Sequence, residues 1–212
     1  MKVIAINGSA RKNGNTAQLL KYSLNGAVSQ GAETEIINLY EYKFRGCVSC
    51  FNCKKQGKHG VCAMKDDITP LLDKLKSADV LIFGSPIYLW DVTGVMRSFL
   101  ERLIFPYVTY KRNPSTYCTK KIKVGFIYTM GSPVWYLNEI DFLPKLKFME
   151  DSIGQTLGSI ESIYCFDTYQ FSDYSKYDVD FDVKAKKLQK INEFPKDCEK
   201  AFLMGKRFVN LN

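Results

Sequence analysis

The sequence predicts an α/β fold in which a five-stranded, doubly wound parallel sheet carries helices on both faces. Short apolar runs alternate along the chain with amphipathic helical segments, and polar turns follow three of those runs. Strand–helix alternation is typical of parallel sheets, because each crossover lays a helix on one face. With 212 residues, the chain is long enough to bury a sizeable core, and we expect a single domain over residues 1–212.

The expected elements follow in chain order. The apolar run Val3–Ile6 predicts the first strand, Thr69-Pro70 predicts a helix start, and Pro195 predicts the start of the last helix. Strands are expected at 2–7, 33–39, 79–84, 122–129 and 158–166, and helices at 15–30, 69–77, 92–104, 141–153 and 195–209. A Cys-rich loop at 43–67 and two long loops, 104–120 and 167–194, complete the chain.

The most informative stretch is the loop from Gly8 to Thr16, which follows the first strand and opens a helix. Unpaired N–H groups and the helix dipole favour an anion at such a helix start. Ser9 and Arg11 add a hydroxyl and a charged fork that suit phosphate oxygens. An ordinary capped turn explains Asn15 and Thr16 but neither Ser9 nor Arg11, so the pattern favours a phosphate site.

The loop also lacks the features of two common phosphate motifs. A nucleoside-triphosphate loop has a lysine directly before its Ser/Thr, whereas Asn15 precedes Thr16. The G-x-G-x-x-G dinucleotide fingerprint is absent, since no glycine follows Gly8 at two residues. A donor-rich loop with one arginine suits a terminal monophosphate such as that of FMN.

In these residues the chain resembles the flavodoxin-like NAD(P)H-dependent FMN reductases, whose first strand ends in Gly-Ser-x-Arg before a small polar residue and Thr. Five strands also suit the flavodoxin-like order 2-1-3-4-5. A Ser-Pro-x-Tyr turn at Ser85–Tyr88 and the pair Thr93-Gly94 resemble further family features. The turn at 129–131 follows the fourth strand at the same edge of the sheet.

This resemblance implies the cofactor-binding residues. The phosphate would be held by Ser9, Arg11, Asn13, Asn15 and Thr16. The ribityl chain and the ring would be bordered by Ser85, Pro86, Ile87, Tyr88, Leu89, Thr129, Met130 and Gly131. Tyr88 could equally be a core aromatic residue. Hydride transfer requires no acid–base side chain, and we expect no catalytic residue of that kind.

The cysteine cluster is the second distinctive feature. Cys47, Cys50 and Cys53 form two C-x-x-C steps, and Cys62 follows. A subset of the family, the iron–sulfur flavoproteins, carries a similar layout followed by an Asp-Asp pair, here Asp66-Asp67. The resemblance implies a [4Fe–4S] cluster on these four cysteines, although the spacer before Cys62 is longer than in that subset. Zinc, or reduced thiols without any metal, are the alternatives.

The function that follows is an FMN-dependent oxidoreductase that transfers hydride from NAD(P)H to FMN and passes electrons to a flavin, quinone or redox-protein acceptor. The alternative is an iron–sulfur electron carrier that relays single electrons. The net charge of +8 comes from scattered lysines and arginines, and no nucleic-acid-binding motif accompanies it. Without an apolar run long enough to span a bilayer or act as a signal peptide, we expect a cytoplasmic protein. The resemblance implies a homodimer or tetramer.

The loop 167–194 carries aromatic residues interleaved with aspartates, among them Tyr169, Phe171 and Tyr174. Such a loop could dock a partner or cover a partner's flavin. Anchoring of the loop on its own subunit is the simpler interpretation of each residue.

Overall fold

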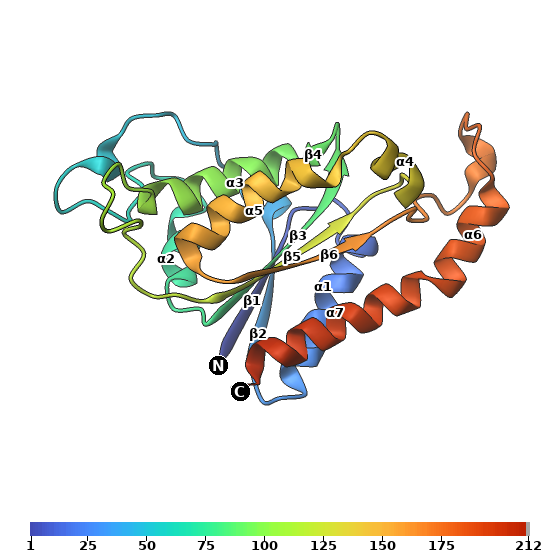
Figure 1. Ribbon diagram of the computed structural model, residues 1–212, viewed down its shortest axis with the longest axis horizontal. Helices are drawn as coiled ribbons and strands as arrows, with labels where there is room; N and C mark the ends of the chain where they lie inside the picture. The colour runs from blue at the N-terminus through green and yellow to red at the C-terminus, as the bar shows by residue number, and fades with distance from the viewer. Residues whose placement is uncertain (211–212) are drawn as a thin grey trace.

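The computed structural model describes residues 1–210 and contains the expected parallel sheet (Figure 1). Its strands are β1 (Lys2–Asn7), β2 (Glu33–Asn38), β3 (Val80–Tyr88), β5 (Lys123–Thr129) and β6 (Ile160–Cys165). They lie in the order β2-β1-β3-β5-β6, and every pair along this path is parallel. Counted among the parallel strands alone, this is the predicted order 2-1-3-4-5. The short strand β4 (Asp91–Val92) folds back antiparallel on the end of β3.

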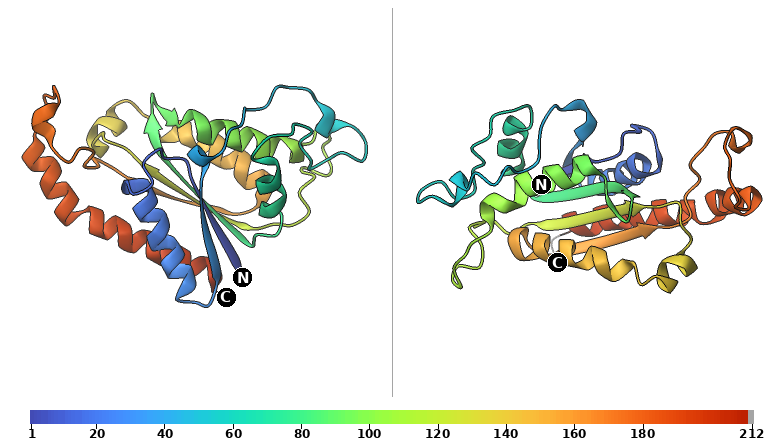
Figure 2. Two further views of the ribbon diagram at one scale, coloured as in Figure 1. Left: turned by 180° about the vertical axis from the view of Figure 1, so that it is seen from behind. Right: turned by 90° about the horizontal axis from the view of Figure 1, so that it is seen from above.

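Helices cover both faces of the sheet, as expected (Figures 1 and 2). The helices α1 (Asn15–Val28) and α7 (Phe194–Val209) lie on one face. The helices α2 (Thr69–Leu75), α3 (Gly94–Ile104) and α5 (Leu143–Leu157) lie on the other. Alternate residues of a strand supply each side: Val80 and Ile82 pack toward α1 and α7, whereas Leu81 packs toward α3.

The helices α1 and α7 approach each other closely enough for their backbones to touch. A Cβ atom on Gly205 would lie 1.7 Å from the carbonyl oxygen of Ser23, and one on Gly26 would lie 1.9 Å from that of Phe202. Only glycine permits such an approach at these two positions. The pair of glycines therefore sets the spacing of the two helices on this face.

Several elements depart from the sequence prediction. The strand β3 continues to Tyr88 rather than ending at 84, because its last residues pair with both β4 and β5. A short helix, α4 (Val134–Glu139), follows Pro133. The long loop expected at 167–194 contains a ten-residue helix, α6 (Val183–Asn192), capped by the Asp182 side chain. Both helices are too polar or too short to show an apolar period of 3.6 residues.

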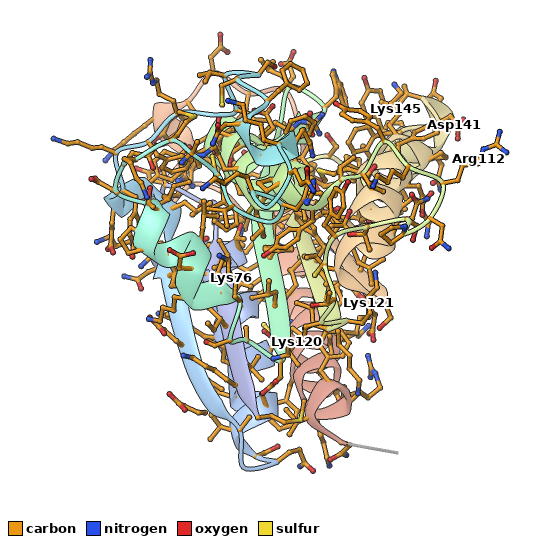
Figure 3. The ribbon with its side chains drawn as sticks, turned by 90° about the vertical axis from the view of Figure 1, so that its left-hand side faces the viewer. Lys76, Arg112, Lys120, Lys121, Asp141 and Lys145 are labelled. Carbon is orange, nitrogen blue, oxygen red and sulfur yellow. The ribbon has the colours of Figure 1, made fainter. Side chains whose placement is uncertain are left out.

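The other long connection, 104–120, returns the chain from α3 to β5. It begins with a 3₁₀ turn at Phe105–Tyr107, and Val108 forms a bridge with Thr116. At its end, Lys120 Nζ donates to the Ala78 carbonyl and to the Asp79 carboxylate, both at 2.8 Å. Figure 3 shows Lys120 beside the start of β5, while Arg112 projects outward from the connection.

The fold places the two candidate sites toward opposite ends of the molecule. The carboxyl ends of β1, β3 and β5 meet near α6, whereas the loop 43–67 lies beside the C-terminal half of α3 (Figures 1 and 2). The helix α3 therefore runs from one region toward the other. Within residues 1–210, no helix combines the length and the apolar character needed to cross a bilayer.

Candidate functional site

A cavity of about 590 Å³ opens at the carboxyl ends of β1, β3 and β5. It is lined by residues of the first loop, of the end of β3, of the turn after β5 and of the segment after β6. Its lining consists of Ser9, Arg11, Asn13, Gly14, Asn15, Thr16, Gln18, Pro86, Ile87, Tyr88, Thr129, Met130, Gly131, Thr168, Tyr169, Gln170, Phe171, Ser172 and Lys190. The structure therefore brings together most of the residues singled out in the sequence.

The loop after β1 is organised by its own side chains. Asn7 Oδ1 accepts a hydrogen bond from the Ser9 N–H at 3.0 Å, and Ser9 Oγ accepts from the Arg11 N–H at 3.2 Å. Gly14 occupies the N-cap of α1, where no side chain of the described residues caps the helix. The first N–H groups of α1 are therefore available to an anion, and the helix dipole adds to the attraction.

Thr16 ties this loop to the turn after β5. Its buried hydroxyl lies 2.7 Å from that of Thr129, so the two side chains share one hydrogen bond across the floor of the cavity. Met130 and Gly131 continue the lining from there. This contact fixes the distance between the loop end of the cavity and the turn at 129–131.

The end of β3 forms a further side, and two expected residues do not line it. Ser85 is fully buried, and its hydroxyl accepts from the Thr93 N–H at 3.0 Å while donating to the Pro86 carbonyl at 2.8 Å. Leu89 is 96% exposed and points away from the protein core. Tyr88, by contrast, lines the cavity and is half exposed, which excludes the core interpretation of this residue.

Leu89 and Trp90 form the two-residue turn between β3 and β4. Both have left-handed backbones, with φ values of 49° and 67°. Such a turn usually contains Asn or Gly, so leucine and tryptophan make it strained. The centre of the Trp90 ring lies 5.6 Å from the centre of the Phe142 ring and 6.0 Å from that of Tyr136. These aromatic contacts hold the turn in place.

The segment 168–172 also lines the cavity, a role in its own chain that the sequence analysis did not predict. Arg11 Nη1 donates to the Gln170 carbonyl at 2.6 Å, and Asn15 Nδ2 donates to the Tyr169 carbonyl at 3.0 Å. The aromatic residues beyond it pack on one another: the Phe171 and Tyr177 rings stack at 3.8 Å. The loop is therefore anchored within its own chain, as its simpler interpretation predicted.

The lining fits a ligand with a dianionic end and a flat ring. Among residues 1–210, two cationic side chains, Arg11 and Lys190, contribute to it, and no carboxylate does. One end offers backbone and side-chain donors, whereas Pro86, Ile87 and Met130 offer apolar surface. Arginine has five N–H donors, so Arg11 can hold the Gln170 carbonyl and still reach a phosphate oxygen.

The four clustered cysteines line a second, smaller cavity against the C-terminal half of α3. Cys53 is buried, Cys47 and Cys62 are half-buried, and Cys50 is exposed. Ser49 and Phe51, between the cysteines, have left-handed backbones with φ values of 51° and 54°. These two bends turn successive cysteines toward the same cavity.

A buried arginine on α3 holds this loop. Arg102 is 1% exposed and donates through Nε to Cys62 Sγ at 3.0 Å. Its Nη1 donates to the Asp66 carboxylate at 2.7 Å and to the Arg45 carbonyl at 3.0 Å, and its Nη2 donates to Asp66 at 3.1 Å. Its neighbour Glu101 accepts from the Cys47 N–H at 3.0 Å. The helix α3 therefore fixes both ends of the cysteine-bearing loop.

The surroundings of Cys53 shift the pKa of its thiol. Burial raises the pKa of the Cys53 thiol; nearby Cys62 and Cys47 also raise it, while Lys54 acts in the opposite direction. No three His, Cys, Asp or Glu side chains in the described part of the chain are arranged to hold a single metal ion.

Known proteins resemble this chain in sequence and in fold. The model of the NADPH-dependent FMN reductase family matches residues 1–132. An iron–sulfur flavoprotein of Methanocaldococcus jannaschii is 40% identical over 102 residues, which cover 48% of this chain and 51% of that protein. A putative NAD(P)H-dependent FMN-containing oxidoreductase of Bacillus subtilis is 28% identical over 102 residues, with the same two coverages of 48% and 51%.

The match to the curated relatives covers about half of this chain, whereas the match in fold covers its full length. The chain spans about half the length of the curated relatives it matches. Among solved structures, an NAD(P)H:quinone oxidoreductase from Methanothermobacter marburgensis gives a TM-score of 0.72 at 13% identity, covering 100% of this chain and 98% of that one. At that identity the likeness establishes the fold alone.

Proposed function

The chain belongs to the NADPH-dependent FMN reductase family of flavin-dependent oxidoreductases, and from this premise we propose that it uses NAD(P)H to reduce a small acceptor such as a quinone or flavin. The observation that carries the proposal is the cavity at the sheet edge, with its donor-rich, cationic end beside an apolar side. FMN, when bound there, supplies the hydride and electron transfer. The side chains bind and orient it.

At the phosphate end, the first loop and the start of α1 do the binding. Ser9, Asn13, Asn15 and Thr16 supply uncharged donors, and Arg11 supplies a charged fork. The Asn7–Ser9 and Ser9–Arg11 hydrogen bonds hold the loop in the shape that presents these groups. The loop is therefore largely formed before the phosphate arrives, which lowers the entropic cost of binding.

At the ring end, Pro86–Tyr88 and Thr129–Gly131 border the flat part of the ligand from two neighbouring strands. Ser85 acts indirectly: its hydroxyl fixes the Thr93 N–H, and Thr93 in turn donates to the Gly8 carbonyl at 2.7 Å. This chain of hydrogen bonds connects the β3 turn to the phosphate loop. Leu89 lies outside the cavity and remains a proposed contact only through its backbone.

The test is to titrate the protein with FMN and with riboflavin and to measure oxidation of NADPH and NADH by the loaded protein. We expect FMN to bind more tightly than riboflavin, because only FMN carries the phosphate that the cationic end holds. Turnover with a quinone or free flavin is expected with at least one of the two nicotinamides. Absence of flavin binding would overturn the proposal.

Replacing Arg11 by alanine is expected to weaken FMN binding roughly tenfold to a hundredfold, because a charge-assisted hydrogen bond contributes about 1.5–3 kcal/mol. Riboflavin affinity should be unchanged. The matched control is Lys12→Ala, since Lys12 is exposed, pairs with Glu41 and does not line the cavity. Equal losses for FMN and riboflavin would show that Arg11 only supports the segment around Gln170.

A second function is favoured by the cysteine cavity. We propose that Cys47, Cys50, Cys53 and Cys62 hold a [4Fe–4S] cluster and that the chain relays single electrons between flavin and a redox partner. Support comes from the four cysteines lining one cavity and from relatives that carry the name iron–sulfur flavoprotein. A cluster would supply one-electron chemistry beside the C-terminal half of α3.

Replacing Cys50 by serine is expected to remove most of the iron and sulfide from anaerobically purified protein, while FMN stays bound. The unchanged protein should contain about four irons per chain and absorb broadly beneath the flavin bands. Cys118→Ser is the control, because Cys118 lies outside the cysteine cavity, where its thiol donates to the Lys120 carbonyl. Stoichiometric zinc, or no metal in the unchanged protein, would contradict the cluster.

The homodimer or tetramer that the family resemblance implies stays a prediction. A groove of about 530 Å³ between α3 and α5 exposes apolar side chains, with Phe148 the most exposed of those that line it. Charged residues of both signs, among them Arg97 and Glu101, stand at the same groove. A self-complementary patch of this kind suits a twofold contact. A sedimentation mass equal to one chain would contradict it.

A further inference from the structure

The helix α6 is anchored beside the proposed flavin cavity by a buried lysine. Lys186 is 6% exposed, and its Nζ donates to the Gly131 carbonyl at 2.8 Å and to the Asp167 carboxylate. Gly131 belongs to the cavity lining, and Asp167 lies two residues after the end of β6. These bonds fix both the position of α6 and the face that it turns toward the cavity.

Lys190 lies one helical turn after Lys186 on that same face. Residues four apart on a helix are neighbours, so the anchoring of Lys186 directs Lys190 to the same side. Lys190 lines the cavity, and its ammonium group lies 4.9 Å from the centre of the Tyr169 ring. The Tyr169 carbonyl in turn accepts the side-chain hydrogen bond of Asn15, in the phosphate loop. Lys190 is thereby connected to the phosphate end through a single residue.

The charges of the lining are matched by a dianion. In the described part of the chain, Lys190 takes part in no ion pair, in contrast to Lys186, which is neutralised by Asp167. With Arg11 it gives the cavity two positive charges that no lining carboxylate offsets. A phosphate monoester carries close to two negative charges at neutral pH, as the second phosphate pKa is about 6.

We propose that Lys190 is a phosphate-binding residue that supplies, together with Arg11, the second positive charge for the 5′-phosphate of FMN. The inference rests on the proposed function, namely that the cavity holds FMN. The family model matches residues 1–132, so Lys190 lies outside the matched part of the chain. The phosphate is therefore held from two sides, by the first loop and by a helix near the C-terminus.

The experiment compares Lys190→Ala, Lys190→Arg and the control Lys187→Ala in titrations with FMN and with riboflavin. Lys187 is exposed on α6 and does not line the cavity. We expect Lys190→Ala to weaken FMN binding about tenfold at low ionic strength without affecting riboflavin, since a lost charged contact acts only on the phosphate. Lys190→Arg should restore most of the affinity, and added salt should narrow the difference.

Three results would overturn the inference. Equal weakening of both flavins would assign Lys190 to packing on Tyr169, and unchanged FMN affinity together with an unchanged KM for NADPH would leave it with no binding role. A raised KM for NADPH, but not NADH, with unchanged FMN affinity would place the phosphate of the nicotinamide at Lys190 instead. If the unchanged protein bound neither flavin, the proposed function itself would fail, which is a separate outcome.

Discussion

Replacing Arg102 by methionine is expected to lower the free energy of unfolding by about 3–5 kcal/mol, as breaking a buried ion pair leaves one charge without its partner. The guanidinium holds three parts of the cysteine-bearing loop at once: Cys62, the Asp66 carboxylate and the Arg45 carbonyl. Methionine fills similar space but donates no hydrogen bond. Urea unfolding of the anaerobically purified protein measures the difference.

The partner residue provides the control for this change. The double substitution Arg102→Met with Asp66→Asn should be more stable than Arg102→Met alone, because no unpaired carboxylate remains. If the two proteins had equal stability, the ion pair would not be the source of the loss. A loss below about 1 kcal/mol in Arg102→Met would place the pair among exposed salt bridges of little effect.

The pH dependence tests the same contact. Burial by itself raises the pKa of the Asp66 carboxyl, but the hydrogen bonds and charge of Arg102 outweigh it and hold that pKa below its ordinary value. A lowered pKa stabilises the fold at pH values above the ordinary carboxyl range, and the contribution is lost as pH falls. The gap between the original protein and Arg102→Met should therefore narrow on acidification below about pH 4.

The parts of the molecule that follow from local sequence were predictable. The five parallel strands were predicted because strand-like and helical segments alternate along the chain, and their order was the one that the family resemblance implied. The polar loop after β1 was equally visible as a candidate phosphate site, since Ser9, Arg11 and Thr16 lie within nine residues of the end of that strand. Local patterns of this kind can be recognised in the sequence without knowing which other elements pack against them.

The side of the cavity next to α6 could not be predicted, because this helix buries a charged side chain and exposes apolar ones. In α6 the lysine at 186 is buried by an ion pair, whereas Leu188 and Ile191 are both 58% exposed. Apolar periodicity therefore points to the wrong face or to no helix. Lys190 became a candidate only once tertiary contacts had placed α6 beside the cavity.

The cysteine-bearing loop shows a similar limit. The spacing of Cys47, Cys50 and Cys53 is local, but the long spacer left the place of Cys62 open. Cys62 reaches the same cavity through Arg102, which is 40 residues away in the chain. An arginine within an amphipathic helix normally indicates the solvent side, so nothing in the sequence marks this one as buried.

Replacing Gly205 by alanine is expected to lower the free energy of unfolding by about 3 kcal/mol, because the added methyl group overpacks the contact between α1 and α7. Its Cβ would lie 1.7 Å from the Ser23 carbonyl oxygen, a backbone atom that cannot rotate away, so the two helices must separate. Urea midpoints measure the loss, with Gly94→Ala as the control, because a Cβ on Gly94 meets no atom within 4 Å.

A second substitution at the same contact tests the mechanism behind this loss. Gly26→Ala should have a similar effect, since its Cβ would lie 1.9 Å from the Phe202 carbonyl oxygen. The two changes together should cost less than the sum of their separate losses, because helices already separated by one methyl group admit the second more easily. Fully additive losses would mean that each glycine is needed for a local reason, and that α1 and α7 do not move as rigid bodies against each other.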